Sequence, residues 1–149
     1  MASDRSRFSF DEAQRYRSVI VQQGRVLLDS DLNEAQDILA EETRVEALDF
    51  VGPSGTPDDG YKISIPSPTA NFDFGIGAGT MYVGGIRVSV PGDPAAKTPP
   101  FSYSKQPEWL APTPAALTGA AKEYVWLELI EHEVSALEDR ALLEPALGG

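Results

Sequence analysis

Apolar side chains recur at near-helical spacing between residues 31 and 50, and this periodicity is the clearest pattern in the chain. The stripe that we expect to face a core contains Leu32, Ala35, Ile38, Leu39, Val45 and Leu48. The opposite face carries Asp37, Glu41, Glu42, Arg44 and Glu46. Gly52 and Pro53 follow this segment, where glycine suits the exit from a helix and proline cannot continue it. The pattern predicts a long helix that ends near Phe50.

Acidic side chains mark the predicted start of this helix. Asp31 is the expected N-cap, with Ser30 as its rival, because a side-chain oxygen at this position accepts from backbone N–H groups of the next turn. Glu34 stands three residues beyond Asp31 and completes an acidic variant of the capping box. Carboxylates in this region also lie where the helix dipole favours negative charge. Asp31 and Glu34 are therefore predicted to act as a structural helix cap.

The same segment partly matches a calcium-binding EF-hand loop. Asp29, Asp31 and Asn33 fill the first three ligand positions. The sixth position should be glycine and is Glu34, and the twelfth should be glutamate and is Ala40. The tight turn and the bidentate ligand are both missing, so we expect capping and no metal site.

Beyond residue 60 the pattern changes to alternation, which is typical of β-strands. Residues 61–65 and 72–78 alternate, and two further runs at 81–83 and 86–90 flank Gly84 and Gly85. Two glycines supply positive φ at no steric cost, so we predict a hairpin with Gly84 and Gly85 as its turn. Residues 91–118 are rich in proline and indicate either an ordered excursion or a disordered linker.

Residues 124–134 are predicted to form a long strand. Tyr124 and Trp126 share one face of this segment, and Val125 and Leu127 share the other. A strand that is apolar on both faces belongs in the middle of a sheet.

These elements together predict an α+β fold, with an extended N-terminal arm and one long helix followed by a mainly antiparallel β domain. Residues 1–52 would form a docking segment of arm, short strand or extended segment at 18–22, and helix. Residues 53–149 would form the β-rich domain, which we expect to continue into a longer native chain.

Composition excludes several classes of partner and site. The chain has 149 residues, a net charge of −11 and no cysteine, and His132 is its single histidine. Phosphate backbones and anionic lipids repel such a chain, so we expect no nucleic acid partner. No apolar run is long enough to insert into a membrane, and the start of the chain does not resemble a signal peptide, which predicts synthesis in the cytoplasm. Thiolate and multi-histidine metal centres are excluded, and we expect no cofactor.

Positive charge gathers near the start of this acidic chain. A basic arm on an acidic body suits docking to another acidic protein. A solvated arm without a partner is the alternative. The candidate docking residues are Arg7, Phe8, Phe10, Arg15, Arg17 and Arg25.

Three other features contain residue types that occur in sites of chemistry. An acidic patch consists of Glu128, Glu131, His132 and Glu133. A carboxylate pair there could act on a glycosidic bond, but a surface or interface role is favoured because no other residues indicate a substrate cleft. Residues 75–80 are rich in glycine but lack the lysine and the following helix of a phosphate loop. Tyr103 and Trp109 could stack on a sugar, although anchoring of their loop is the commoner role. We expect no catalytic residue.

Four stretches in order resemble a known domain family of phage tails and contractile injection systems. Residues 22–34 resemble its Gln-Gly-Arg-Val segment followed by Asp-x-Asp-Trp-Asn-Glu. Residues 77–86 resemble its Gly-x-Gly-x-x-Tyr-Val-Asp-Gly segment, 124–129 its long apolar strand, and 136–139 with 144–149 the turn that follows. Leu32 stands where the family has Trp, and Gly84 where it has Asp, which puts the subfamily in doubt and not the fold.

The resemblance implies a non-enzymatic structural component of a virion tail or injection-system baseplate, acting as the N-terminal attachment module of a tail fibre, tail spike or baseplate protein. It implies other tail or baseplate proteins as partners and a homo-oligomer such as a trimer. It offers no catalytic residue to carry over. The alternative is the N-terminal module of a glycan-binding or glycan-degrading β-helix protein with its active site downstream. The scarcity of histidine and cysteine argues against a free-standing enzyme.

Overall fold

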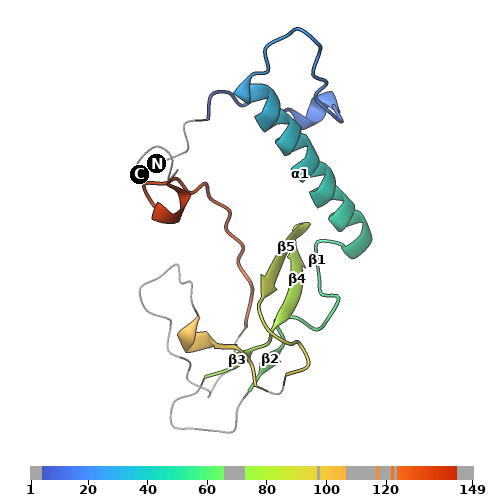
Figure 1. The fold of residues 1–149 in the computed structure, drawn as a ribbon. Helices are drawn as coiled ribbons and strands as arrows, with labels where there is room; N and C mark the ends of the chain where they lie inside the picture. Colours follow the sequence, from blue (N-terminus) through green and yellow to red (C-terminus); the bar gives the residue numbers. More distant parts are fainter. Residues whose placement is uncertain are drawn as a thin grey trace. The chain divides into compact units, whose positions relative to one another are not determined.

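A computed structural model describes residues 5–65, 73–96, 98–106, 117, 122 and 124–143 (Figure 1). These residues form one α-helix and two small antiparallel sheets, which confirms the α+β class. The elements in chain order are η1 (Glu12–Gln14), α1 (Asp29–Val51), β1 (Ser54–Gly55), β2 (Ile63–Ser64), β3 (Gly75–Ile76), β4 (Gly79–Val83), β5 (Ile86–Val90), β6 (Phe101–Ser102), η2 (Tyr103–Lys105) and η3 (Arg140–Leu142). None of the described helices has the length and apolar character needed to cross a membrane.

The chain divides into two compact units, and the division falls inside α1. The first unit contains Met1–Glu42 and Glu128–Gly149, and the second contains Thr43–Leu127. The predicted domain boundary after residue 52 stays a prediction.

The β4–β5 hairpin is the longest strand pair in the second unit. Its strands pair in antiparallel register from Gly79 opposite Val90 to Val83 opposite Ile86. Gly84 and Gly85 form the turn at φ values of 59° and 84°, the left-handed conformation that a two-residue hairpin turn requires. β1 pairs with the other edge of β4 and completes a three-stranded sheet (Figure 1).

The second sheet of this unit joins β2, β3 and β6, with β3 in the middle. Phe74 directly precedes β3 and is buried, and its ring lies 5.0 Å from the ring of Tyr103. Part of the proline-rich stretch is thus ordered, and Tyr103 anchors it as the commoner role of a lone aromatic predicts. Trp109, the other aromatic considered there, lies outside the described residues.

The faces of α1 differ from those predicted. Ile38 is buried, but Leu32 and Leu39 are exposed although they belong to the stripe expected to face a core. In the first unit the arm instead contacts Asp37 on the charged side. In the second unit the hairpin turn lies so close that a Cβ on Gly85 would sit 2.3 Å from the Arg44 carbonyl oxygen and 3.0 Å from the Leu48 side chain.

The prediction of a central strand at residues 124–134 is wrong for the described chain. The segment has no strand pairing, and Tyr124 and Trp126 are 88% and 78% exposed. A central strand needs a hydrogen-bonded neighbour on each edge. Within the described residues, the strands of the two sheets pair only with one another, so this segment receives neither neighbour.

We predict that Gly85→Ala destabilises the protein by about 2–4 kcal/mol, because a Cβ there would meet the Arg44 carbonyl in addition to the strain of positive φ. The free energy of unfolding in urea measures the effect. Gly84→Asn is the matched control in the same turn, since nothing lies near a Cβ at Gly84 and asparagine tolerates its φ. Equal losses from the two variants would contradict the close packing of the turn on α1.

Candidate functional site

The arm is held on the acidic side of α1 by Arg5 in the first unit. The Arg5 guanidinium forms an ion pair with the Asp37 carboxylate and donates to the Asn33 carbonyl oxygen at 3.4 Å. The two charged side chains are only 19% and 28% exposed. Solvent screens such a half-buried pair less than a surface pair, so it fixes the start of the arm.

Two serines of the arm donate hydrogen bonds to carboxylates of the same helix. The Ser9 hydroxyl donates to Glu34 Oε2 at 2.5 Å. The Ser6 hydroxyl donates to the Asp29 carboxylate, and this hydrogen bond is the main cause that lowers the pKa of Asp29, with a further contribution from the Ser30 backbone N–H. The arm therefore contacts the first turns of α1 at several points.

The N-terminal cap of α1 lies three residues earlier than predicted, at Leu28 instead of Asp31. The Leu28 carbonyl already accepts from the backbone N–H groups of Asp31 and Leu32, so the helix begins at Asp29. Asp31 Oδ2 accepts from the Leu28 N–H at 3.1 Å, which is the contact that the third helical residue makes in a capping box. Glu34 instead accepts from Ser9, and Ser30 is buried within the first turn.

Some of the candidate docking residues are engaged within the chain. The exposed Phe8 ring lies 4.8 Å from the Arg5 guanidinium, in cation–π geometry, and Phe10 is half-buried. Arg17 forms an ion pair with Glu42 at 3.5 Å, although both side chains are well exposed. Part of the positive charge of the arm thus meets α1 rather than a partner.

The other three arginines face solvent. Arg7, Arg15 and Arg25 are exposed, and within the described part of the chain their side chains make no ion pair. They are the members of the predicted docking set whose charge is left for another molecule.

The loop between η1 and α1 carries exposed apolar side chains. Ile20, Val21 and Val26 are largely exposed. They border an open hollow of about 370 Å³, and its lining is Val19, Ile20, Val21, Gln22, Arg25, Val26, Leu27, Leu28 and Asp31. Arg25 places one positive charge at this apolar rim.

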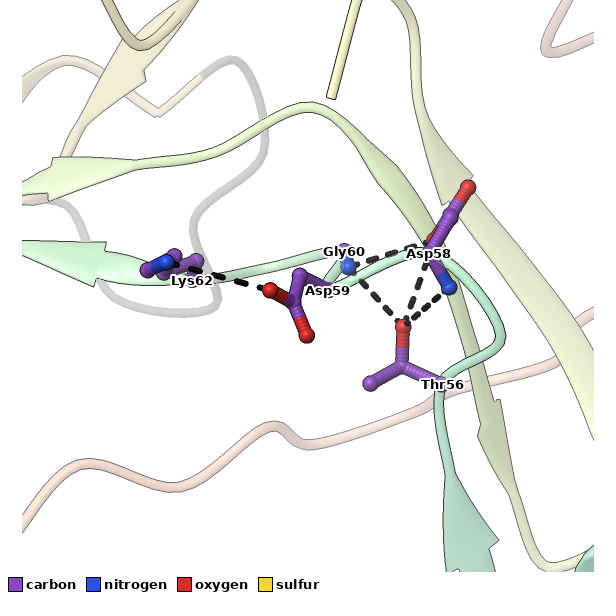
Figure 2. A network of polar contacts seen from close by, with 5 residues as sticks. All are labelled: Thr56, Asp58, Asp59, Gly60 and Lys62. Atoms are coloured by element: carbon purple, nitrogen blue, oxygen red, sulfur yellow. Dashed lines mark hydrogen bonds and ion pairs between the residues drawn. The ribbon is translucent and has the colours of Figure 1, made fainter. Parts of the chain in front are cut away.

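A polar network in the second unit was missed by the sequence analysis (Figure 2). Asp58 Oδ1 accepts from the Thr80 N–H at 2.9 Å and from the Gly60 N–H at 3.2 Å. The Thr56 hydroxyl donates to the Thr80 carbonyl at 2.7 Å and accepts from the Gly60 N–H at 2.8 Å. The loop is thereby tied to the start of β4. The run Thr-Pro-Asp-Asp-Gly was the available signal, because Thr and Asp side chains close such turns on nearby N–H groups.

This network is structural in character. The Thr80 backbone N–H is the main cause that lowers the pKa of Asp58, and the Thr56 and Gly60 donors act in the same direction. A Cβ on Gly60 would lie 2.4 Å from the Thr80 nitrogen, so the loop backbone touches β4 directly. The exposed Asp59 and Lys62 add an ion pair at 3.8 Å (Figure 2).

The residues weighed for chemistry do not converge. Glu128, Glu131 and His132 lie exposed on the irregular segment 124–134. Residues 75–80 contribute β3 and the start of β4, as expected for glycines that permit close backbone approach. Among the described residues, no three His, Asp or Glu side chains are grouped as ligands of a metal ion.

Comparison with known proteins gives one match. A family model described as a family of unknown function, DUF6519, matches residues 1–149. No curated protein and no solved structure matches the chain.

We predict that Arg5→Glu releases the arm, because it places two carboxylates together where Arg5 and Asp37 now pair. Amide hydrogen exchange in residues 6–17 should speed up by at least about tenfold, which corresponds to about 1.4 kcal/mol of local stability. The charge-reversed double variant Arg5→Glu with Asp37→Arg should restore protection. Arg7→Glu is the matched control, and an equal effect from it would contradict the assignment.

We also predict a pH signature for Asp58. Its pKa is lowered in the folded chain, so its contribution to stability is present above the unfolded value of about 3.9 and is lost as pH falls through the folded pKa. Asp58→Asn should reduce stability above about pH 4 and flatten the loss of stability below it. Urea unfolding between about pH 2 and pH 6 measures both effects. Asp59→Asn, next in sequence and exposed, should keep the wild-type profile, and a wild-type profile for Asp58→Asn would refute the prediction.

Proposed function

We propose that this chain, which belongs to the DUF6519 family, is a non-enzymatic structural component of a phage tail or of a phage-tail-like contractile injection particle. It would act as an N-terminal attachment module of a tail fibre, spike or baseplate protein, within the assembled particle and in several copies. The observation that carries the proposal is the order of the four resembling stretches, at residues 22–34, 77–86, 124–129 and 136–139 with 144–149.

The arrangement of the arm supports an attachment role. Arg5 and Ser9 hold the arm on α1, so its remaining side chains are presented from a fixed base rather than from a free tail. Ordering before binding lowers the entropy that association costs. Arg7, Arg15 and Arg25 then offer positive charge that steers the arm to an acidic surface.

The exposed apolar loop supports the same role. Ile20, Val21 and Val26 lie together along a short stretch of chain next to Arg25. Contiguous apolar groups with polar neighbours mark protein interaction sites on soluble proteins. The partner would present an apolar ridge with acidic residues beside it, as another protein of the particle could.

The proposal is tested by the protein composition of purified particles and by deletion of the gene that encodes this chain. Mass spectrometry of tail-like particles purified from the source organism should find this chain in fixed stoichiometry with the tube and baseplate proteins. Deleting its gene should give particles that lack the attached fibre or spike. Complete particles that neither contain nor require the chain would refute the proposal.

The docking surface is tested by charge reversal. We predict that the triple variant of Arg7, Arg15 and Arg25 to Glu loses at least about tenfold in incorporation into particles, because attraction at the acidic partner becomes repulsion. Its circular dichroism should match that of the wild type, since these side chains form no ion pair within the described residues. The triple variant of Lys62, Lys105 and Lys122 to Glu changes net charge equally and serves as the control. Normal incorporation of the arginine variant would overturn the basic-arm mechanism.

A further inference from the structure

The outer edge of β5 has no strand partner within the described chain (Figure 1). β5 pairs with β4 on one side and ends its three-stranded sheet on the other. The residues that flank a two-residue hairpin turn form a hydrogen-bonded pair, and such pairs alternate with non-hydrogen-bonded ones along the strands. Val83 and Ile86 are the flanking pair, so the N–H and C=O groups of Arg87 and Ser89 point away from β4. As far as the structure describes the chain, this edge is open to another strand.

Residues 124–129 have the side-chain pattern of a strand but lack a neighbour. They form neither helix nor strand in the structure, and apolar residues occupy both faces of the alternating pattern. Tyr124 and Trp126 are largely exposed, and Val125 and Leu127 are 52% and 40% exposed. Adding this segment to a sheet edge would pair its backbone groups and cover its apolar side chains in one step.

The open edge in the same chain favours a second copy as the partner. β5 and residues 124–127 belong to the same compact unit, and the structure leaves them unpaired there. Each copy therefore carries one strand-like segment without an edge and one edge without a strand. Two copies satisfy both needs, because identical chains supply segments and edges in equal number.

We propose that residues 124–128 of one copy bind the β5 edge of a second copy as an added antiparallel strand. Glu128 then lies opposite Arg87 of the second copy, and Trp126 lies opposite Ser89. Arg87 and Ser89 are the β5 residues whose backbone groups point away from β4, so each of the two pairs exchanges two hydrogen bonds. The contact involves one continuous segment and one strand, and it requires no particular placement of the two units of either copy.

Side-chain chemistry selects this register. Leu127 lies opposite Val88 of the second copy and Val125 lies opposite Val90, on the face where β5 is half-buried. A shift of one residue in either direction moves these side chains to the other face and places Glu128 against an apolar residue of β5. The register with apolar pairs on one face and the charged pair on the other is therefore favoured.

The charged pair also favours the antiparallel direction. Arg87 and Glu128 are both exposed, and opposite charges directly across two strands attract. The Trp126 ring lies on the same face, within reach of the Arg87 guanidinium. A parallel strand with the same charged pair would place Trp126 beyond β5, at the Gly85 turn, and would place Glu131 on the apolar face of β5.

The area of the contact sets the expected strength. Five residues of added strand bury on the order of 500 Å² per copy, of which Tyr124 and Trp126 supply the largest part. A standard interface buries roughly 800 Å² per partner. Reciprocal exchange, in which each copy gives its segment to the other, doubles the buried area and closes the arrangement as a dimer. We therefore expect a reversible dimer with a dissociation constant of about 1–100 µM.

Sedimentation of the full chain tests the association at about 0.15 M salt, where the repulsion between two chains of net charge −11 is screened beyond about 8 Å. The wild type should shift from one copy to two over the range of about 1–100 µM. Tyr124→Ser with Trp126→Ser should raise the dissociation constant at least about tenfold, because the two largest apolar contacts are removed. Both side chains are exposed, so circular dichroism should be unchanged. Phe50→Ser removes an exposed aromatic ring elsewhere in the chain and should leave the dimer intact.

Charge reversal tests the register. Glu128→Arg should raise the dissociation constant about tenfold, because it places two positive charges opposite each other, and Arg87→Glu should do the same with two negative charges. The double variant should return to within about threefold of the wild type. Arg87 also donates to Thr80 Oγ1 at 3.3 Å in its own chain, whereas Glu128 is exposed, so Glu128→Arg separates the contact between copies from that internal one. Lys105→Glu changes net charge as much as Arg87→Glu and should leave the dimer intact.

Crosslinking of mixed chains distinguishes a second copy from pairing within one chain. The chain has no native cysteine, so introduced thiols report only on the new positions. A Val90→Cys chain mixed with a Val125→Cys chain under oxidation should form a disulfide-linked pair, because Cβ atoms directly opposite each other lie about 4.5–5.5 Å apart. Neither variant alone should crosslink. Val90→Cys mixed with Trp126→Cys is the control, since these side chains point to opposite faces of the sheet.

The inference deepens the proposed function and rests on it for the statement that several copies act together in a particle. A chain that stays monomeric at about 100 µM overturns the strand addition. A disulfide that forms within a chain carrying both Val90→Cys and Val125→Cys, but not between the mixed chains, overturns the second copy as partner. If a monomeric chain still enters particles, the proposed function stands without the strand addition. If the chain dimerises as described but is absent from particles, the proposed function fails and the strand addition is retained.

Discussion

The acidic side of α1 is the constraint on which the arrangement of the arm in the first unit depends. In the first unit it attracts the arm, since Arg5 pairs with Asp37 and Ser9 donates to Glu34. In the second unit Gly85 lets the hairpin turn reach the Arg44 carbonyl and the Leu48 side chain of α1. Leu32 and Leu39 of the predicted apolar stripe are exposed, and Ile38 of the same stripe is buried.

The second unit relies on close backbone contact more than on a large apolar core. Phe74 and Ala78 are its buried apolar side chains among the described residues. The loop at residues 56–60 instead brings Gly60 onto the backbone of Thr80 and secures the contact with the carboxylate of Asp58. Such packing tolerates no added side-chain atom, because interiors at this density have no free volume. Gly75 and Gly79 meet that requirement, whereas Gly84 has open space around it and serves the turn.

Features set by nearby residues could be predicted from the sequence, and features set by distant residues could not. The helix and the Gly84–Gly85 turn depend on local periodicity and on positive φ, and the structure contains both elements. Which face of the helix is covered depends on Arg5, which is 32 positions from its partner Asp37 and gives no periodic signal. The fate of residues 124–134 likewise depends on whether other strands are free to pair with them. Of the candidate docking residues, Arg17 has a partner on α1, and neither periodicity nor composition could have indicated it.

The division of the chain inside α1 has a consequence for synthesis on the ribosome. The second unit, Thr43–Leu127, is a continuous run of chain, so its contacts can form as soon as its last residues emerge. The first unit combines Met1–Glu42 with Glu128–Gly149 and cannot be completed until the later segment has been translated. Its arm and helix must therefore remain soluble while the rest of the chain is being made. The ion pair of Arg5 with Asp37 links two residues that emerge early from the ribosome. It can therefore hold the arm against α1 before residues 128–149 have been translated.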